Sequence, residues 1–189
     1  MRRVAVIAGV LLVAAGWDAS AAMGQSCVKA GDTVISNSVV RLYDDAADRL
    51  YGCWLPTARR IRLDAKLGRW RLANVKGRYA AVVFERDASR RGVIVWARLG
   101  DRPKSRVVHA FRARSDPPAD QLFVSKLGAI AFSAPDTIGY IAPPASTGKV
   151  RYRELDSGPR VSPRSLWADE HAGRLRWQSG GLRKSARWR

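Results

Sequence analysis

The chain has 189 residues, with 34 Lys or Arg against 16 Asp or Glu, so its formal net charge is +18 at neutral pH. About 168 residues follow the segment that we interpret below as a signal peptide, which is enough for one domain with its own core and excludes a miniature that depends on disulfides. A surface this positive attracts polyanions, namely anionic lipid head groups, cell-wall polymers or nucleic acid, and the attraction weakens as salt rises. Because arginine greatly outnumbers lysine, a genomic bias in composition is the alternative explanation of the charge.

Residues 1–21 have the pattern of a secretory signal peptide. Two arginines precede the apolar run Val4–Gly16, and small residues with an Ala-x-Ala step end at Ala21. The run of thirteen residues is shorter than the roughly twenty that span a membrane, although an anchor that is not cleaved is the alternative. The residues before Cys27 do not form a lipobox. We therefore expect a secreted or extracytoplasmic protein with no membrane-spanning segment after cleavage.

The two cysteines, Cys27 and Cys53, both follow the signal peptide. An even number of cysteines in an exported chain favours a disulfide over free thiols or a metal site. A loop of this length contributes about 3 kcal/mol when it is closed. The disulfide is expected to fix the first segment to the first pair of strands.

Short apolar runs, often alternating with polar residues and separated by Gly, Pro, Asp and Ser, predict strands rather than helices. Arginines at alternate positions are expected to face solvent. A helical turn or a loop is predicted at Asp44–Leu50. The predicted strands include Ile61–Asp64, Tyr79–Phe84, Val93–Ala97, Arg106–Phe111, Ala129–Phe132, Val150–Arg153 and Arg174–Trp177.

A degenerate repeat of about forty residues, each with up to four short strands, can be drawn four times between residues 22 and 189. The copies are Thr33–Asp64, Trp70–Leu99, Leu122–Leu155 and Ser165–Trp188. This pattern predicts one all-β domain of antiparallel meanders that forms a small or partial β-propeller. A β-sandwich, or an irregular meander, is the alternative.

The repeat consists of a Gly before an apolar strand with an aromatic residue, a short polar loop and a basic outgoing strand. In this respect it resembles the repeats of secreted bacterial β-propeller-like proteins, most of which have no assigned function. The resemblance covers most of the chain after the signal peptide and implies a scaffold that binds rather than catalyses. It implies no particular ligand and no site residues.

No catalytic, cofactor or metal site is predicted. His109 is expected on the polar face of a strand and His171 in a turn, and neither has ligand spacing for zinc. The acidic cluster at Asp44, Asp45 and Asp48 is interpreted as a solvated turn. Residues 146–149 end like a phosphate-binding loop but precede a strand, so they are discounted.

The C-terminal stretch carries the candidate anion-binding site. No acidic residue follows Glu170, and basic residues are interleaved with Trp177 and Trp188. Basic side chains next to indoles can bind anionic polymers. The alternative is that Trp177 belongs to the core and the basic residues only solvate a final hairpin. The candidate residues are Arg174, Arg176, Arg183, Lys184 and Arg187.

The sequence therefore predicts a non-enzymatic binding or structural module that presents a basic surface to an anionic envelope polymer, a lipid or a protein partner. A secreted hydrolase with a site formed by several loops is the rival hypothesis. Nucleic-acid binding is permitted by the charge, but the export signal argues against it.

Overall fold

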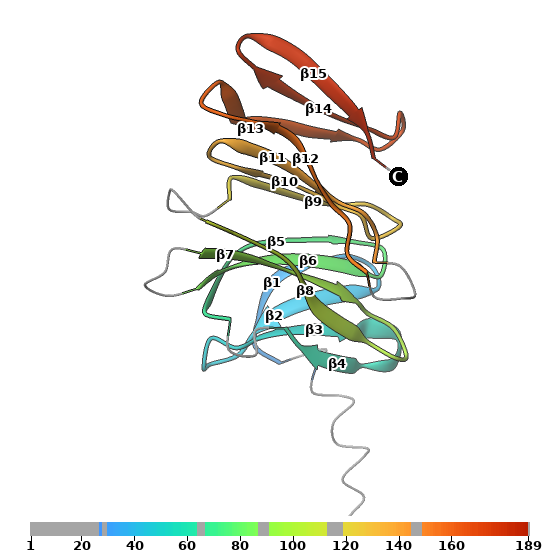
Figure 1. Cartoon of the computed structure of the whole chain (residues 1–189). Coiled ribbons are helices and arrows are strands. Elements are labelled where there is room, and N and C mark those ends of the chain that lie inside the picture. The colour runs from blue at the N-terminus through green and yellow to red at the C-terminus, as the bar shows by residue number, and fades with distance from the viewer. Residues whose placement is uncertain are drawn as a thin grey trace, which may run out of the picture.

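The computed structural model describes Cys27 and residues 30–63, 67–86, 91–112, 119–144 and 149–188. The predicted signal peptide and the discounted loop at residues 146–148 lie outside these ranges. The fold is all-β, as predicted, and consists of four antiparallel sheets (Figure 1). Within the described ranges, no helix is long and apolar enough to cross a membrane.

We call the sheets A to D in chain order. Sheet A contains β1 (Asp32–Ser36), β2 (Val40–Asp44), β3 (Leu50–Trp54) and β4 (Arg59–Arg62), with a short 3₁₀-helix at Leu55–Thr57. Sheet B contains β5 (Arg69–Lys76), β6 (Tyr79–Arg86), β7 (Arg91–Arg98) and β8 (Lys104–Arg112). Sheet C contains β9 (Gln121–Val124), β10 (Ile130–Ala134), β11 (Thr137–Ile141) and β12 (Tyr152–Ser157). Sheet D contains β13 (Val161–Asp169), β14 (Arg174–Ser179) and β15 (Leu182–Arg187).

In every sheet the strands neighbour one another in chain order, which confirms the predicted antiparallel meanders. The four predicted copies coincide with the four sheets, except that the second copy stopped before β8. The strand predicted at Val150–Arg153 begins at Tyr152 and continues to Ser157. The Asp44–Leu50 segment is the turn of the β2–β3 hairpin and not a helical turn.

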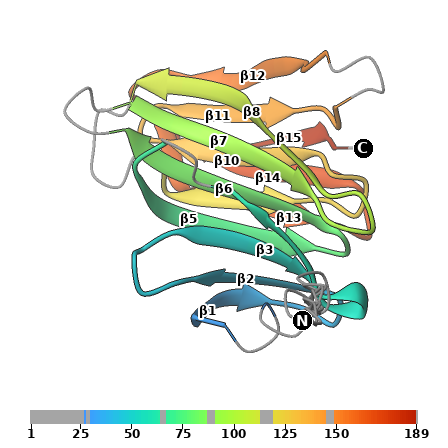
Figure 2. The same ribbon diagram turned by 90° about the horizontal axis from the view of Figure 1, so that it is seen from below.

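The sheets stack face to face in chain order, with sheets A and D at opposite ends (Figures 1 and 2). Sheet B supplies apolar side chains to both of its neighbours. Val82 and Phe84 of β6 pack on sheet A, whereas Ala81 and Val83 of the same strand pack on sheet C. A third cluster between sheets C and D contains Ile138, Leu166, Leu175, Trp177 and Trp188.

The first strands of successive sheets contact one another, β1 with β5, β5 with β9 and β9 with β13. Sheets A, B and C therefore approach one another along their first strands, whereas β13 of sheet D also contacts β10 and β11 of sheet C. In the described part of the chain the stack does not close, because its first and last sheets are separated by the other two (Figure 1). This arrangement is consistent with a partial propeller or with a layered sandwich.

On one side of the stack, hairpin turns of one sheet form hydrogen bonds with the neighbouring sheet. The side-chain amide of Asn37 donates to the carbonyl of Gly77 at 3.0 Å. The indole N–H of Trp96 donates to the carbonyl of Gly128 at 3.0 Å inside the protein. These bonds fix the lateral position of sheet A on sheet B and of sheet B on sheet C, which apolar packing alone defines only loosely.

At the outer strands, sheets B and C are joined by an aromatic cluster that the sequence did not predict. His109 was expected on a polar strand face, but it stacks on Tyr152 with 4.1 Å between ring centroids and also contacts Phe111 and Phe132. Gly92 leaves space for this cluster, since a Cβ there would lie 2.3 Å from the ring of Phe111. Burial of His109 lowers its pKa below the ordinary value of 6.5.

The free energy of unfolding should fall as the pH is lowered through 6.5, because the unfolded chain then binds a proton that folded His109 does not. This loss of stability continues until the pH has fallen below the pKa of His109 in the folded protein. We expect His109→Phe to remove this proton uptake, which amounts to at most about one proton per molecule. Urea titrations at a series of pH values measure it, with His171→Asn in an exposed turn as control, and an unchanged pH slope in His109→Phe would contradict the assignment.

A disulfide between Cys27 and Cys53 covers the outer face of sheet A, with 5.8 Å between the Cα atoms, as predicted. Both cysteines are fully buried and pack with Tyr43. The guanidinium of Arg41 donates to the carbonyl oxygens of Cys27, at 3.2 Å, and Gly31, at 2.8 Å. The disulfide therefore holds the segment at Cys27 against β3.

Replacing both cysteines with alanine should lower the free energy of unfolding by about 3 kcal/mol, mainly because the unfolded chain gains freedom. Urea unfolding of the double variant, compared with the native chain in the presence and absence of a reductant, measures the effect. A native chain that loses no stability on reduction would show that the disulfide does not constrain the fold.

Candidate functional site

The outward face of sheet D is formed by alternate residues of β14. Leu175, Trp177 and Ser179 are buried, and they alternate with the exposed Arg174, Arg176 and Gln178. This is the pattern of a strand with one face on the core and one in solvent. Trp177 and Trp188 are each only 4% exposed, so both predicted indoles belong to the core and not to the binding face.

The pairing of β14 with β15 brings four of the predicted basic residues to this same face. Arg187 lies opposite Arg174, and Arg183 lies opposite Gln178. Residues directly opposite each other in an antiparallel pair point to the same side of the sheet. We call this surface the arginine face and define it by Arg174, Arg176, Gln178, Arg183, Ser185 and Arg187 with Trp167 of β13.

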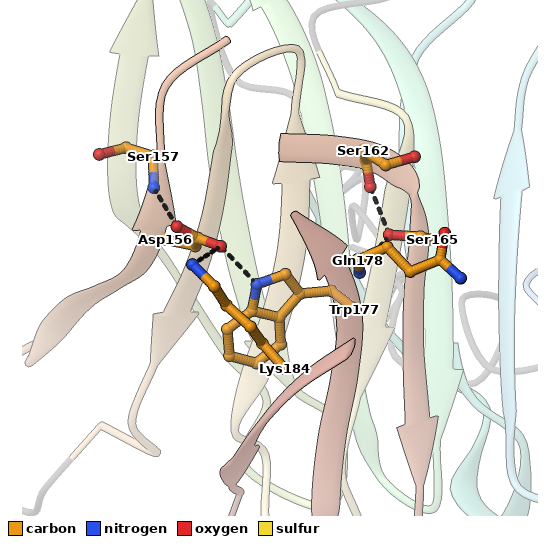
Figure 3. Close-up of polar contacts among 7 residues, drawn as sticks. All are labelled: Asp156, Ser157, Ser162, Ser165, Trp177, Gln178 and Lys184. Atoms are coloured by element: carbon orange, nitrogen blue, oxygen red, sulfur yellow. Dashed lines mark hydrogen bonds and ion pairs between the residues drawn. The ribbon is translucent and has the colours of Figure 1, made fainter. Parts of the chain in front are cut away.

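Lys184, the fifth predicted residue, points to the other side of the sheet. Its ammonium lies 2.9 Å from a carboxylate oxygen of Asp156 on β12, and the indole N–H of Trp177 donates to that carboxylate at 2.7 Å (Figure 3). Burial raises the pKa of Asp156, but the hydrogen bonds from Lys184, Trp177 and Ser179 outweigh it, so the pKa is lowered. Lys184 therefore joins sheet D to sheet C.

Trp167 is the large aromatic residue of the arginine face, and it was not among the predicted binding residues. It is 54% exposed and lies opposite Arg176, whose guanidinium is 5.3 Å from the indole ring. The neighbouring Leu166 is buried in the C–D cluster, so strand alternation in Ser165-Leu166-Trp167 could have indicated an outward indole.

An irregularity in β13 comes just before Trp167. The pairing register with β14 shifts between Ser162 and Trp167, and this stretch contains Pro163, which has no N–H to donate. The hydroxyl of Ser165 links the two strands at this irregularity. It donates to the carbonyl of Ser162 at 2.6 Å and accepts the N–H of Gln178 at 2.7 Å (Figure 3). The bulge thereby sets the face on which Trp167 appears.

The arginine face has an excess of positive charge. Asp169 neutralises Arg176 through an ion pair of 2.9 Å, but among the described residues no carboxylate is within ion-pair distance of Arg174, Arg183 or Arg187. Arg174 and Arg187 stand directly opposite each other, which is an unfavourable pairing of like charges. An open groove of about 520 Å³ runs over this surface, lined by atoms of Trp167, Arg174, Arg176, Gln178, Arg183, Ser185 and neighbouring residues.

A second depression, of about 380 Å³, contains Ser125, Glu170 and His171, the residue types of a hydrolase. The hydroxyl of Ser125 accepts the backbone N–H groups of Leu127 and Ala129 at 3.2 and 3.0 Å, and Glu170 forms an ion pair with Lys76 at 2.8 Å. In the described contacts, Ser125 and His171 share no hydrogen bond. The arrangement holds turns together and does not assemble a nucleophile with its base.

The acidic residues near position 45 are part of a turn, as the sequence predicted. A side-chain hydrogen bond from Arg49 is the main cause that lowers the pKa of Asp45 to about 2, with backbone donors at Ala47 and Arg49 in support. Its carboxylate closes the β2–β3 turn. Among the described residues, no three His, Cys, Asp or Glu side chains gather in a way that could hold a metal ion.

Comparison of the chain with protein-family models, with curated proteins and with solved structures finds no match. The resemblance to secreted β-propeller-like proteins therefore remains a prediction, and the arginine face is interpreted from its own geometry.

Asp156→Asn should lower the free energy of unfolding at neutral pH by about 1–2 kcal/mol, since the buried indole N–H of Trp177 and Lys184 lose a charged acceptor. Because the pKa of Asp156 is depressed in the folded state, this stabilisation is present above 3.8 and is lost as the pH falls through the folded pKa. Urea unfolding curves of the variant and the native chain should therefore converge in acid. Asp32→Asn on β1 serves as control, and a constant difference at all pH values would contradict the assignment.

Proposed function

We propose that this protein is a binding module of the cell envelope that holds a linear anionic polymer on its arginine face. The observation that supports this most directly is the concentration of four exposed arginines and one exposed indole around a single carboxylate, on a sheet face that no other described sheet covers. Guanidinium groups without a carboxylate partner can donate paired hydrogen bonds to phosphate, sulfate or carboxylate groups of a ligand.

The spacing on a sheet favours a polymer over a single small anion. Alternate residues of one strand are about 6.7 Å apart, and neighbouring strands are about 4.8 Å apart. Arg174 and Arg176 form one row along β14, and Arg183 and Arg187 form a second row along the neighbouring β15. Cationic groups therefore recur in two adjacent rows. A chain with an anionic group in each repeating unit can contact several of them at once, and each contact adds to the affinity.

A polymer is also favoured over a bilayer. Peripheral proteins that enter a membrane interface combine positive charge with a sizeable buried apolar area. The outward side of β13, β14 and β15 offers Trp167 as its one exposed large apolar side chain among the described residues. The indole face instead suits stacking on a sugar or another flat group of the polymer.

The predicted signal peptide and the Cys27–Cys53 disulfide support a location outside the cytoplasm, because disulfides persist in oxidising compartments. Cell-wall polymers are the abundant polyanions there. Nucleic acid shares the anionic chemistry, so single-stranded DNA is the competing ligand that must be tested.

The triple variant Arg174→Ser, Arg183→Ser and Arg187→Ser should bind polyglycerol phosphate about 100-fold more weakly than the native protein at low salt, at about 1 kcal/mol for each lost contact. Native binding should itself weaken between about 0.1 M and 1 M salt, where the screening length falls from about 10 Å to about 3 Å. Calorimetric titration measures both, with neutral dextran, anionic vesicles and single-stranded DNA as parallel ligands.

The matched control replaces Arg102, Lys104 and Lys149 with serine, which removes the same charge from exposed positions on other parts of the protein. This control should retain nearly all of the affinity. An equal loss in both triple variants would mean that net charge alone attracts the polymer, and tighter binding of vesicles or DNA than of polyglycerol phosphate would reject an envelope polymer as the ligand.

A further inference from the structure

The geometry points to a second binding site, beyond the proposed function, at the free edge of β15: it accepts an extended acidic segment of another protein as an added strand. Sheets A, B and C each have four strands, whereas sheet D has three in the described part of the chain. Its outermost strand, β15, pairs only with β14. The other side of β15 is an open sheet edge, which is a template for strand addition.

The backbone groups that are available on this edge follow from the hairpin turn. Gly180 and Gly181 both have positive φ, 58° and 79°, and they form a two-residue turn between Ser179 and Leu182. The residues that flank such a turn exchange both backbone hydrogen bonds, and bonded pairs then alternate along the ladder. The bond from the N–H of Trp188 to the carbonyl of Gly173, at 3.0 Å, has the same phase.

It follows that Leu182, Lys184 and Ala186 direct their N–H and C=O groups toward β14. The N–H and C=O groups of Arg183, Ser185 and Arg187 point away from β14, to the open edge. These three residues carry their side chains on the arginine face. An added antiparallel strand would therefore pair with residues 183, 185 and 187, and its own side chains opposite them would lie beside two guanidinium groups.

The inward side of the same edge is also incompletely covered. Leu182 is 68% exposed, the largest exposed fraction among the large hydrophobic residues of the described chain. A groove of about 410 Å³ lies beside it, lined by the end of β12, residues 158–160, the β14–β15 turn, Leu182 and Lys184. An apolar side chain on the inward side of the added strand would cover Leu182.

The other outer strands offer less. On β8 and β12, His109 and Tyr152 stack on each other across the two sheets. On β4, the side chain of Arg59 donates to the carbonyl of Asp101. Val107 on β8 and Tyr152 on β12 are also exposed, at 48% and 38%, but the pairing of each of these strands shifts register. By contrast, β15 pairs with β14 without a shift and carries the more exposed Leu182.

The charges on β15 select the occupant. If a second copy of the chain paired through its own β15 so that all three edge residues were matched, Arg183 of one copy would lie opposite Arg187 of the other, which is unfavourable. An acidic strand reverses the sign of both contacts. The expected pattern is alternating, with acidic residues opposite Arg183 and Arg187 and apolar residues opposite Leu182 and Ala186.

The test is calorimetric titration of the purified protein with the end-blocked peptide Glu-Val-Thr-Val-Glu-Val, whose two Glu residues fall opposite Arg187 and Arg183 in the antiparallel register. Methylation of the backbone nitrogens of Thr and the second Glu removes groups that face β15 and should weaken binding at least about tenfold. Methylation of the first two Val nitrogens, which face away, should leave the affinity nearly unchanged. Equal effects of the two methylation patterns would overturn strand addition.

On the protein side, Ser185→Pro removes an edge N–H that the β14 ladder does not use, and proline is tolerated at such positions. Ser185→Pro should weaken the binding of the acidic peptide at least about tenfold, whereas Ser185→Ala should not weaken it. Circular dichroism shows whether the proline variant is folded. Should it unfold, the charge reversal Arg183→Glu with Arg187→Glu replaces it, and this variant should bind Lys-Val-Thr-Val-Lys-Val in preference to the acidic peptide.

Two variants distinguish failure of the edge site from failure of the proposed polymer site. Arg174→Ser with Arg176→Ser should weaken the binding of polyglycerol phosphate and leave the binding of the peptide unchanged. Leu182→Ser, at an exposed position on the inward side of β15 and outside the arginine face, should weaken the binding of the peptide and leave that of polyglycerol phosphate unchanged. Peptide binding that disappears in the first variant and persists in the second would assign the peptide to the arginine face and overturn the edge site.

Discussion

Burial of apolar side chains on both faces of the middle sheets is the constraint on which the rest of this structure depends. Val82 and Phe84 pack to one side of β6 and Ala81 and Val83 to the other, so sheet B is stable only between two further sheets. Ile130 and Phe132 of β10 pack on sheet B, and Ala131 of that strand packs on sheet D. Burial of this kind is the dominant favourable term in folding, and here it forces a stack.

A stack that does not close has two ends, and this protein treats them differently. The outer face of sheet A is covered by a segment that the disulfide holds in place, with Cys27, Tyr43 and Cys53 buried together. The outer face of sheet D remains in solvent and carries arginines around a single large exposed apolar side chain, Trp167, among the described residues. The same open end therefore provides both the proposed polymer site, from its side chains, and the proposed strand site, from its backbone edge.

Much of the candidate site could be predicted because strand alternation is a local property. The pattern of β14 alone indicates that Arg174 and Arg176 face outward, and the spacing of β15 supplies Arg183 and Arg187. The same alternation places Lys184 on the opposite side of β15 from Arg183 and Arg187, so including it in the predicted site was wrong. No local pattern, however, could identify its partner. Its partner, Asp156, lies 28 residues earlier, in another sheet.

The sequence by itself determined the all-β class, the four meanders, the disulfide and the basic C-terminal hairpin, since each of these depends on local periodicity, turn residues or a cysteine count. Only the tertiary structure decided how the sheets stack, why His109 joins an aromatic cluster, and that Trp167 rather than Trp177 is exposed. The physical reason is that these features depend on which sheet covers which face and on the register shift in β13, and both arise from contacts between residues far apart in the chain.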